Sequence, residues 1–363
     1  MLENFYEGKY KIFLGIAIAI LVIMGIFAFA WPGITKGIDL SGGTLLIART
    51  DKAIDSTKLS DAISSKLDLV DLAISSIASP TGYGVTIKYA QSKVLAAAQA
   101  EIDSAKALLE KDPNSAEAKT HADNAIAILS KYLSEKPPAT NNPSESVANA
   151  DVAFTDAKAS INKQIQNTLI ETFGLKPDTA FQIKEVSPTL GASFWQTAIN
   201  VIIIVLILVI LVVFFFFREI IPSIVVFSCG IFDAVFSLGA MAFFGIPLGL
   251  NTIPALLMLM GYSIDTDVMV ASRVLTRKEG TPEKRASSSM LTGFTMTGTT
   301  IAAVTVMVII SYVYQVEVIF DIGSVLLLGL IGDLIGTWLM SASLLLWYSE
   351  FKQKRIDKKF AGR

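Results

Sequence analysis

The chain has 363 residues, of which 52% are hydrophobic and only 17% are charged, and its net charge is −2. Soluble domains carry about 25% charged residues, so this composition excludes an ordinary soluble protein and indicates a membrane protein with a polar domain. No basic stripe is present, which argues against nucleic-acid binding. A single cysteine, Cys229, excludes a disulfide within the chain, and a single histidine, His121, argues against a histidine-based metal site.

The first predicted membrane span covers residues 12–31 and follows a polar N-terminus of residues 1–11. An apolar run of this length crosses a hydrocarbon core of about 30 Å. It is longer than the roughly 7–15 residues of a signal-peptide core, so we expect an uncleaved anchor.

Residues 32–190 form one polar domain in this interpretation. Glycines between Gly37 and Thr44 mark the entry into a strand, and Ser56 or Thr57 is expected to cap the next helix. The order of elements predicts a β-α-β-β-α-β, or ferredoxin-like, domain. The predicted elements are a strand ending near Arg49, a helix to residue 67, strands at 70–79 and 85–89 joined by a turn at 80–84, a helix from residue 147 or 151 to 173, and a strand at 180–186.

Residues 91–146 interrupt this domain as an alanine-rich insertion. Alanine and straight-chain residues are the best helix formers, so residues 91–133 predict a helical hairpin with a break at 112–115. Residues 135–146, with three prolines, predict a loop. The insertion is interpreted as a solvated helical spacer or as a docking arm for a partner.

Five further apolar runs, each long enough to span, lie between residues 194 and 347. They cover residues 194–217, 220–244, 250–270, 291–314 and 319–347. Cytoplasmic loops carry an excess of Lys and Arg. Such residues occur between the second and third spans, around the connection between the fourth and fifth spans, and in the tail of residues 348–363. They are Arg218, Arg273, Arg277, Lys278, Lys284, Arg285, Lys352, Lys354, Arg355, Lys358, Lys359 and Arg363. We therefore expect both termini in the cytoplasm, with residues 32–190 outside a multi-pass cell-membrane protein.

Four carboxylates lie inside the predicted spans: Asp233, Asp265, Asp267 and Asp333. A charged aspartate at the centre of a membrane helix costs roughly 2.5–3.5 kcal/mol on insertion scales, and such residues usually serve ion or proton movement. Asp265 and Asp267 are separated by about 200° around a helix, so they cannot share a face. The four are candidates for a proton relay, and the alternative is that they are protonated, hydrogen-bonded contacts between helices.

The sequence offers little for other chemistry. Ser41-Gly42-Gly43 lacks the Gly-Lys-Ser/Thr of a phosphate-binding loop. Zinc-ligand spacing is absent from the sequence. We therefore predict no enzyme activity, no metal and no cofactor.

Several motifs together resemble the SecF family, accessory subunits of the Sec protein-export translocase and six-span relatives of the resistance-nodulation-division transporters. The resemblance covers the chain except roughly residues 91–146. It is carried by Gly37-Ile-Asp39-Leu-Ser-Gly42-Gly43-Thr44 after the first span, Phe232-Asp233, Gly261-Tyr262-Ser263-Ile264, the segment 277–282 and Ile331 to Thr337.

Two departures from the family pattern concern the carboxylates. The family commonly reads Asn-Asp-Thr after Gly-Tyr-Ser-Ile, whereas this chain reads Asp265-Thr266-Asp267, so either aspartate is a candidate. The family also commonly carries an Arg in the fifth span, where this chain has Thr295, Thr297, Thr299 and Thr300. This pattern is similar to the archaeal branch.

The resemblance implies a subunit that pairs with SecD and uses the proton motive force to assist preprotein movement outside the SecY channel. It implies SecD, SecY, the translocating unfolded preprotein and the lipid bilayer as partners. Two other interpretations stay open at this point: a half-size exporter of lipids or drugs, and a non-transporting scaffold for SecD.

Overall fold

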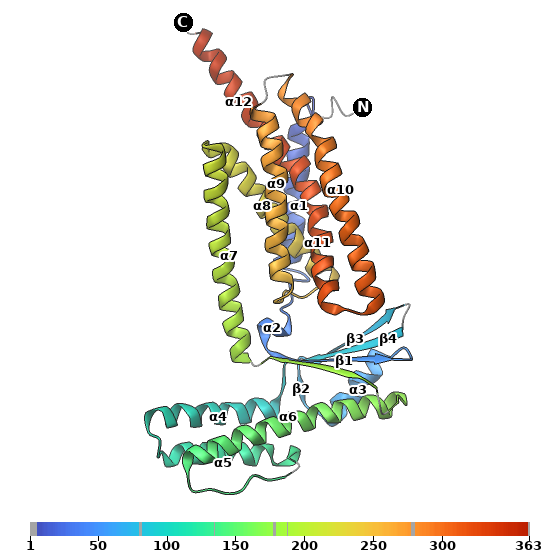
Figure 1. The fold of residues 1–363 in the computed structure, drawn as a ribbon, viewed down its shortest axis with the longest axis vertical. Coiled ribbons are helices and arrows are strands. Elements are labelled where there is room, and N and C mark those ends of the chain that lie inside the picture. Colours follow the sequence, from blue (N-terminus) through green and yellow to red (C-terminus); the bar gives the residue numbers. More distant parts are fainter. Residues whose placement is uncertain are drawn as a thin grey trace. The chain divides into compact units, whose positions relative to one another are not determined.

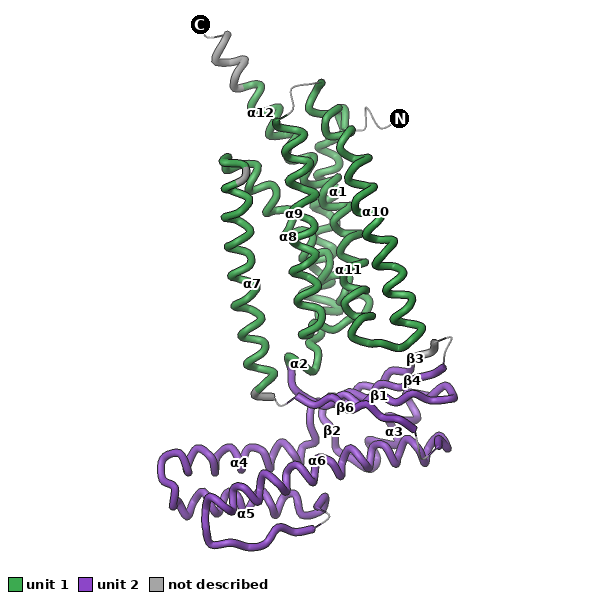
Figure 2. Tube along the Cα trace, in the orientation of Figure 1, with its two compact units in different colours: residues 1–40, 190–363 green, residues 41–189 purple. Residues whose placement is uncertain are grey.

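A computed structural model describes residues 6–79, 82–133, 135–176, 179–186, 188–276 and 280–361. The chain divides into two compact units, Met1–Leu40 with Leu190–Arg363, and Ser41–Thr189 (Figure 2). We call them the helical unit and the sheet unit. The described residues do not include the tip of the expected turn, at 80–81, or three of the predicted cytoplasmic cations, Arg277, Lys278 and Arg363.

The helical unit contains, among the described residues, six helices that are long and apolar enough to cross a membrane, as the sequence predicts. The sixth is formed by α11 and α12 (Figure 1), with a π-helical turn, η2, between them. The helices of this unit are α1 (Tyr10–Phe29), α7 (Pro188–Phe217), α8 (Ile220–Phe244), α9 (Thr252–Thr276), α10 (Pro282–Tyr314), α11 (Glu317–Ile335), η2 (Gly336–Ser341) and α12 (Ala342–Ala361).

Three of these spans form the interior of the helical unit. The most apolar window of α8 is 61% buried, that of α9 is 44% buried and that of the sixth span is 39% buried, against 11% or less for α1, α7 and α10. Small residues allow the close packing. A Cβ atom on Gly239 of α8 would collide with the backbone carbonyl of Met24 in α1. Three of the candidate proton-relay residues, Asp233, Asp267 and Asp333, belong to these interior spans.

The sheet unit is built on a four-stranded antiparallel sheet in the order β3-β4-β1-β6. The register places Leu46 of β1 opposite Ile87 of β4 and Ile183 of β6. Leu46 and Ile87 are fully buried, whereas Ile183 on the edge strand is 42% exposed. The strands are β1 (Gly43–Thr50), β3 (Ala73–Ser79), β4 (Gly82–Tyr89) and β6 (Phe181–Val186), with a short pair formed by β2 (Leu69–Val70) and β5 (Gln91–Ser92).

Helices complete the core of this unit. α3 (Ser56–Lys66) follows β1, and α6 (Pro143–Phe173) precedes β6. Between β5 and α6 the alanine-rich insertion forms α4 (Lys93–Lys111) and α5 (Ala116–Leu129), which pack on each other and on α6. The hairpin predicted from residues 91–133 is therefore present, with its break at 112–115.

The strand expected at 70–79 is divided into β2 and β3, and β4 begins at Gly82, within the expected turn. Three expectations about helices were also wrong. The cap of α3 is Asp55, whose carboxylate accepts from the backbone N–H groups of Thr57 at 3.0 Å and Lys58 at 3.3 Å. Asn142 caps α6, which begins at Pro143 because proline is tolerated in the first turn, so part of the expected loop is helical. A single helical turn, α2 (Ile38–Ser41), precedes β1 where a direct entry into a strand was expected.

Candidate functional site

Three of the four predicted aspartates converge inside the helical unit. Asp233 of α8, Asp267 of α9 and Asp333 of α11 are each completely buried. Asp233 interacts electrostatically with both of the others. Asp265 lies on the exposed side of α9, because its position is about 200° around the helix from Asp267. The structure thus separates the two neighbours, and only Asp267 belongs to the cluster.

Hydroxyl groups surround these carboxylates. Ser263 donates a hydrogen bond to Oδ2 of Asp233. The hydroxyl of Thr337 lies 3.1 Å from Oδ1 of Asp267 and 3.2 Å from Oδ1 of Asp333, and so connects α9 with the sixth span. Ser341 and Cys229 lie beside Asp267, and Thr297 lies beside Asp333. We define the carboxylate cluster as the three aspartates with the hydroxyl and thiol side chains beside them: Asp233, Asp267, Asp333, Ser263, Thr297, Thr337, Ser341 and Cys229.

The cluster has more acceptor oxygens than donors. Oδ1 of Asp233, Oδ2 of Asp267 and Oδ2 of Asp333 are buried, with no hydrogen-bond partner in the described structure. No Lys or Arg occurs in the sequence between Arg285 and Lys352, so α11 and η2 supply no cation. Burying three unpaired negative charges together is costly, which favours carboxyl groups that hold protons. This arrangement is chemically suited to binding protons.

Glycines bring the sixth span against α8 at the cluster. A Cβ atom on Gly336 would lie 2.7 Å from Oδ1 of Asp233, and one on Gly332 would lie 2.5 Å from the ring of Phe236. A Cβ on Gly329 would collide with Leu259 of α9. These positions need glycine because the neighbouring helices leave no room for a side chain.

The Gly261-Tyr262-Ser263 motif contributes to the cluster through one residue. Ser263 holds Asp233, while the Tyr262 hydroxyl accepts a hydrogen bond of 3.2 Å from Thr300 of α10. Gly261 has no atom within 4 Å of an added Cβ and is exposed. The motif therefore orients three successive residues towards three different surroundings.

The glycine motif near residue 40 has structural roles. The N–H of Gly37 donates to the Leu248 carbonyl at 2.6 Å, which ties this segment to the loop between α8 and α9. Asp39, in the same segment, is only 5% exposed. Gly42 and Gly43 have positive φ angles of 76° and 128°, and a Cβ on Gly43 would lie 2.6 Å from the Tyr89 carbonyl. These glycines allow the chain to turn into β1 against β4.

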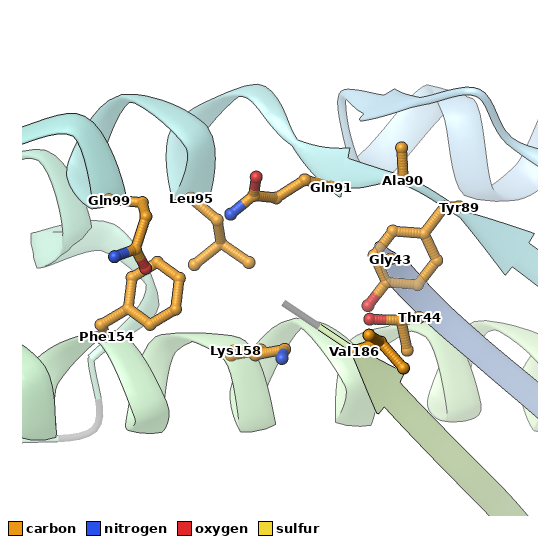
Figure 3. A pocket seen from close by; sticks show the side chains of 10 residues that line it. All are labelled: Gly43, Thr44, Tyr89, Ala90, Gln91, Leu95, Gln99, Phe154, Lys158 and Val186. Carbon is orange, nitrogen blue, oxygen red and sulfur yellow. The ribbon is translucent and has the colours of Figure 1, made fainter. Parts of the chain in front are cut away.

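A small pocket lies in the sheet unit between α4 and α6 (Figure 3). Its empty space, with open solvent included, is about 370 Å³. Lys158 forms a 2.7 Å ion pair with Glu185, Glu185 accepts a 2.5 Å bond from Asn162, and Asn162 accepts a 2.6 Å bond from the Tyr89 hydroxyl. Burial raises the pKa of Tyr89 to about 12. These contacts tie α6 to β4 and β6.

Sequence reasoning missed the importance of Thr337 and Ser341. Thr337 lies four residues after Asp333, a spacing that places two side chains on one helical face. That signal was available, but it did not reveal that Asp267 of α9 lies on the other side of the same hydroxyl. No group of three or more His, Cys, Asp or Glu side chains suited to a metal ion occurs among the described residues.

Comparison with known proteins identifies the family. The family model described as protein export membrane protein SecD/SecF, C-terminal, matches residues 162–351, just over half of the chain. The chain belongs to the SecD/SecF family. Six spans and this membership make it a multi-pass membrane protein.

Archaeal relatives of this SecD/SecF family member carry the name protein-export membrane protein SecF. The relative from Methanocaldococcus jannaschii is 27% identical over 350 residues, which cover 96% of this chain and 99% of the relative. The relative from Methanothermobacter thermautotrophicus is 40% identical over 137 residues, 37% of this chain and about half (48%) of that protein. That from Pyrococcus furiosus is 39% identical over 51% of this chain and 60% of its own.

A solved structure shares the fold of the SecD/SecF family member described above. The crystal structure of SecDF from Thermus thermophilus superposes with a TM-score of 0.63 at 14% identity. The match covers 94% of this chain and 38% of the SecDF chain.

Proposed function

We propose that this protein is an accessory subunit of the Sec protein-export system that pairs with a SecD-type partner. The family match over residues 162–351 is the observation that carries the proposal, and the relatives' name, protein-export membrane protein, supports it. The comparison SecDF protein is described as translocon-associated, and this chain corresponds to 38% of it. A separate SecD-type chain would supply the remainder, and the substrate would be an unfolded preprotein leaving SecY.

The carboxylate cluster is proposed to link export to the proton motive force. It supports this role because its three buried aspartates lack a cationic partner on α11 and η2 and have unpartnered oxygens. Moving one charge across 100 mV is worth about 2.3 kcal/mol, enough to bias a conformational equilibrium. Asp233, Asp267 and Asp333 would carry the protons.

Asp265 would have a different task, at the contact with the SecD-type partner. It is exposed in the middle of α9, where contact with lipid would cost a charged group roughly 2.5–3.5 kcal/mol. Gly261, one turn earlier on the same side, leaves space for another helix. A polar group from a partner helix would satisfy Asp265, as small and polar residues do between membrane helices.

The sheet unit is proposed to be a ferredoxin-like domain outside the cell, with both termini in the cytoplasm. The strand order β3-β4-β1-β6, with α3 after β1 and α6 before β6, supports the topology. The Lys and Arg residues near the ends of α9 and α12 support the orientation. Outside the cell, this unit would meet polypeptide emerging from the channel.

The test compares two aspartates in one helix. Asp267→Asn is expected to lower proton-gradient-dependent export at least tenfold in vesicles, because the cluster loses a proton carrier. Asp265→Asn is the matched comparison: it keeps the cluster, so the remaining export should still depend on the gradient, while copurification with the SecD-type partner is expected to weaken. Unchanged export from Asp267→Asn, with and without a gradient, contradicts proton coupling and favours the scaffold function. A small-molecule efflux defect without an export defect favours the exporter function.

A further inference from the structure

The Thr337 hydroxyl lies within hydrogen-bonding distance of two carboxyl groups. Its oxygen is 3.1 Å from Oδ1 of Asp267 and 3.2 Å from Oδ1 of Asp333. A threonine hydroxyl has one hydrogen to donate, and an ionised carboxylate can only accept. Thr337 can therefore donate to one of these oxygens only. The second contact is a hydrogen bond only when that carboxyl group is protonated and donates to Thr337.

Two further hydroxyl groups indicate that the ligand of this site is a proton. Ser341 and Thr297 are fully buried, and their oxygens have no hydrogen-bond partner in the described structure. Ser341 lies beside Asp267, and Thr297 lies beside Asp333. Asp267 thus has a second hydroxyl next to it, and Asp333 has two more, because Ser263 also lies beside Asp333. Asp233 and Cys229 are the other titratable groups that face this pair. A hydroxyl group both donates and accepts hydrogen bonds. It can therefore reverse its hydrogen bond when the neighbouring carboxyl group gains or loses a proton, and it stays neutral itself.

We propose that Asp267, Thr337 and Asp333 form a proton-binding site in which the threonine hydroxyl relays a proton between the two carboxyl groups. When Asp333 is protonated, its proton passes to Oγ1 of Thr337, and the hydroxyl's own proton passes to Oδ1 of Asp267. One O–H bond breaks and one forms at Thr337, so the hydroxyl stays neutral. The negative charge moves from Asp267 to Asp333.

The π-helical turn η2 holds the bridging hydroxyl in place. The N–H of Ala342 donates to the Thr337 carbonyl, one residue further than in an α-helix. The turn carries both Thr337 and Ser341, the two hydroxyls that lie beside Asp267. It also carries Gly336, whose lack of a side chain leaves room for Asp233. Such turns are frequent at functional sites, and rewinding this one would move the bridge relative to α9.

The experiment measures protonated carboxyl groups by infrared spectroscopy of the full-length protein in lipid bilayers. The wild type is expected to show a carboxylic-acid C=O band at neutral pH, and Asp267→Asn or Asp333→Asn is expected to reduce it. Thr337→Val keeps the side-chain shape but removes the hydroxyl, so the band should move to higher frequency. Thr337→Ser should leave the band where the wild type has it. Thr295→Val, which removes an exposed hydroxyl bonded to the Leu291 carbonyl, is the control and should change nothing.

The inference deepens the proposed proton-linked function, but its readout does not depend on export. A band that is unaffected by Thr337→Val means that the threonine is only a spacer, and the relay is wrong. A band that appears only when sodium is withdrawn makes the site a cation site, which also overturns the proposal. If the band behaves as expected but export is normal in Asp267→Asn, the proton site stands and the proposed coupling to export fails.

Discussion

At the scale of single residues, the chemistry depends on which side of a helix a carboxylate faces. Asp265 and Asp267 are two positions apart, yet one is exposed and the other is completely buried. Charge is tolerated at the first position only with a polar partner, and at the second only with protons or hydrogen bonds. The same spacing rule that prevents them from sharing a face assigns them different tasks in the proposed function.

Glycine at position 336 is predicted to be essential for packing at the cluster. Gly336→Ala places a methyl group 2.7 Å from Asp233 Oδ1 and 2.8 Å from the Phe232 ring. We expect a loss of about 1–3 kcal/mol in the free energy of unfolding, as for other overpacked cores. Denaturant unfolding in detergent, followed by tryptophan fluorescence, measures it.

Gly298→Ala in α10 is the control for this substitution. No atom lies within 4 Å of an added Cβ at Gly298, so the methyl group meets no neighbour. Alanine is the better helix former by about 1 kcal/mol, and the variant should be at least as stable as the wild type. Equal stability of the two variants would show that the close approach at Gly336 carries no cost.

At the scale of elements, a chain of polar contacts ties α6 to the sheet. Tyr89 of β4 donates to Asn162 of α6, and Glu185 of β6 accepts from Asn162 and pairs with Lys158. These contacts are worth more than exposed ones because Tyr89 is only 1% exposed and Asn162 only 5%. They attach the alanine-rich insertion, through α6, to both β4 and β6.

The stability of the sheet unit is predicted to fall between pH 10 and pH 12. Burial raises the pKa of Tyr89 from 10.0 to about 12 in the folded protein. The free energy of unfolding therefore keeps its full value below pH 10. It falls as the pH rises towards 12, by about 2–3 kcal/mol in total, because the unfolded chain loses the tyrosine proton first. Urea unfolding followed by circular dichroism at several pH values measures this slope.

Two tyrosines of the same strand separate this effect from general alkaline unfolding. Tyr89→Phe is expected to flatten the slope between pH 10 and pH 12, because the titrating group is gone. Tyr83, at the other end of β4, is 39% exposed, and Tyr83→Phe should leave the slope as in the wild type. The same slope in Tyr89→Phe and wild type would contradict the assignment.

At the scale of the whole molecule, the proposed orientation follows from the distribution of Lys and Arg. Asn114, in the exposed turn between α4 and α5, is predicted to be outside, and Lys352 in α12 is predicted to be cytoplasmic. Asn114→Cys should react with a membrane-impermeant maleimide in intact cells. Lys352→Cys should react only after the cells are permeabilised. The native Cys229 is buried and provides the background measurement; the reverse pattern of labelling would contradict the orientation.

Hydropathy and local periodicity by themselves determined much of the architecture. The six spans, the helical hairpin and the strands around β4 follow from runs of apolar residues and from helix-forming composition, which are properties of neighbouring residues. The free-energy cost of an aspartate in an apolar helix could also be predicted, because it depends only on the residue type and on the apolar run that contains it. Helix ends were less predictable: Asp55 and Asn142 cap helices through side-chain contacts that other polar residues nearby could equally have made.

Only the tertiary structure decided which aspartates lie together. Asp267 meets Asp333 through the Thr337 hydroxyl, although 70 residues separate Thr337 from Asp267. Whether Asp265 or Asp267 faces inward depends on how α9 is rotated against its neighbours, and a single helix sequence does not state that rotation. The π-helical turn that carries Thr337 packs against α1, α8 and α9, which are contacts between residues far apart in the sequence. Local sequence thus placed the carboxylates within the membrane spans, and long-range packing made three of them one site.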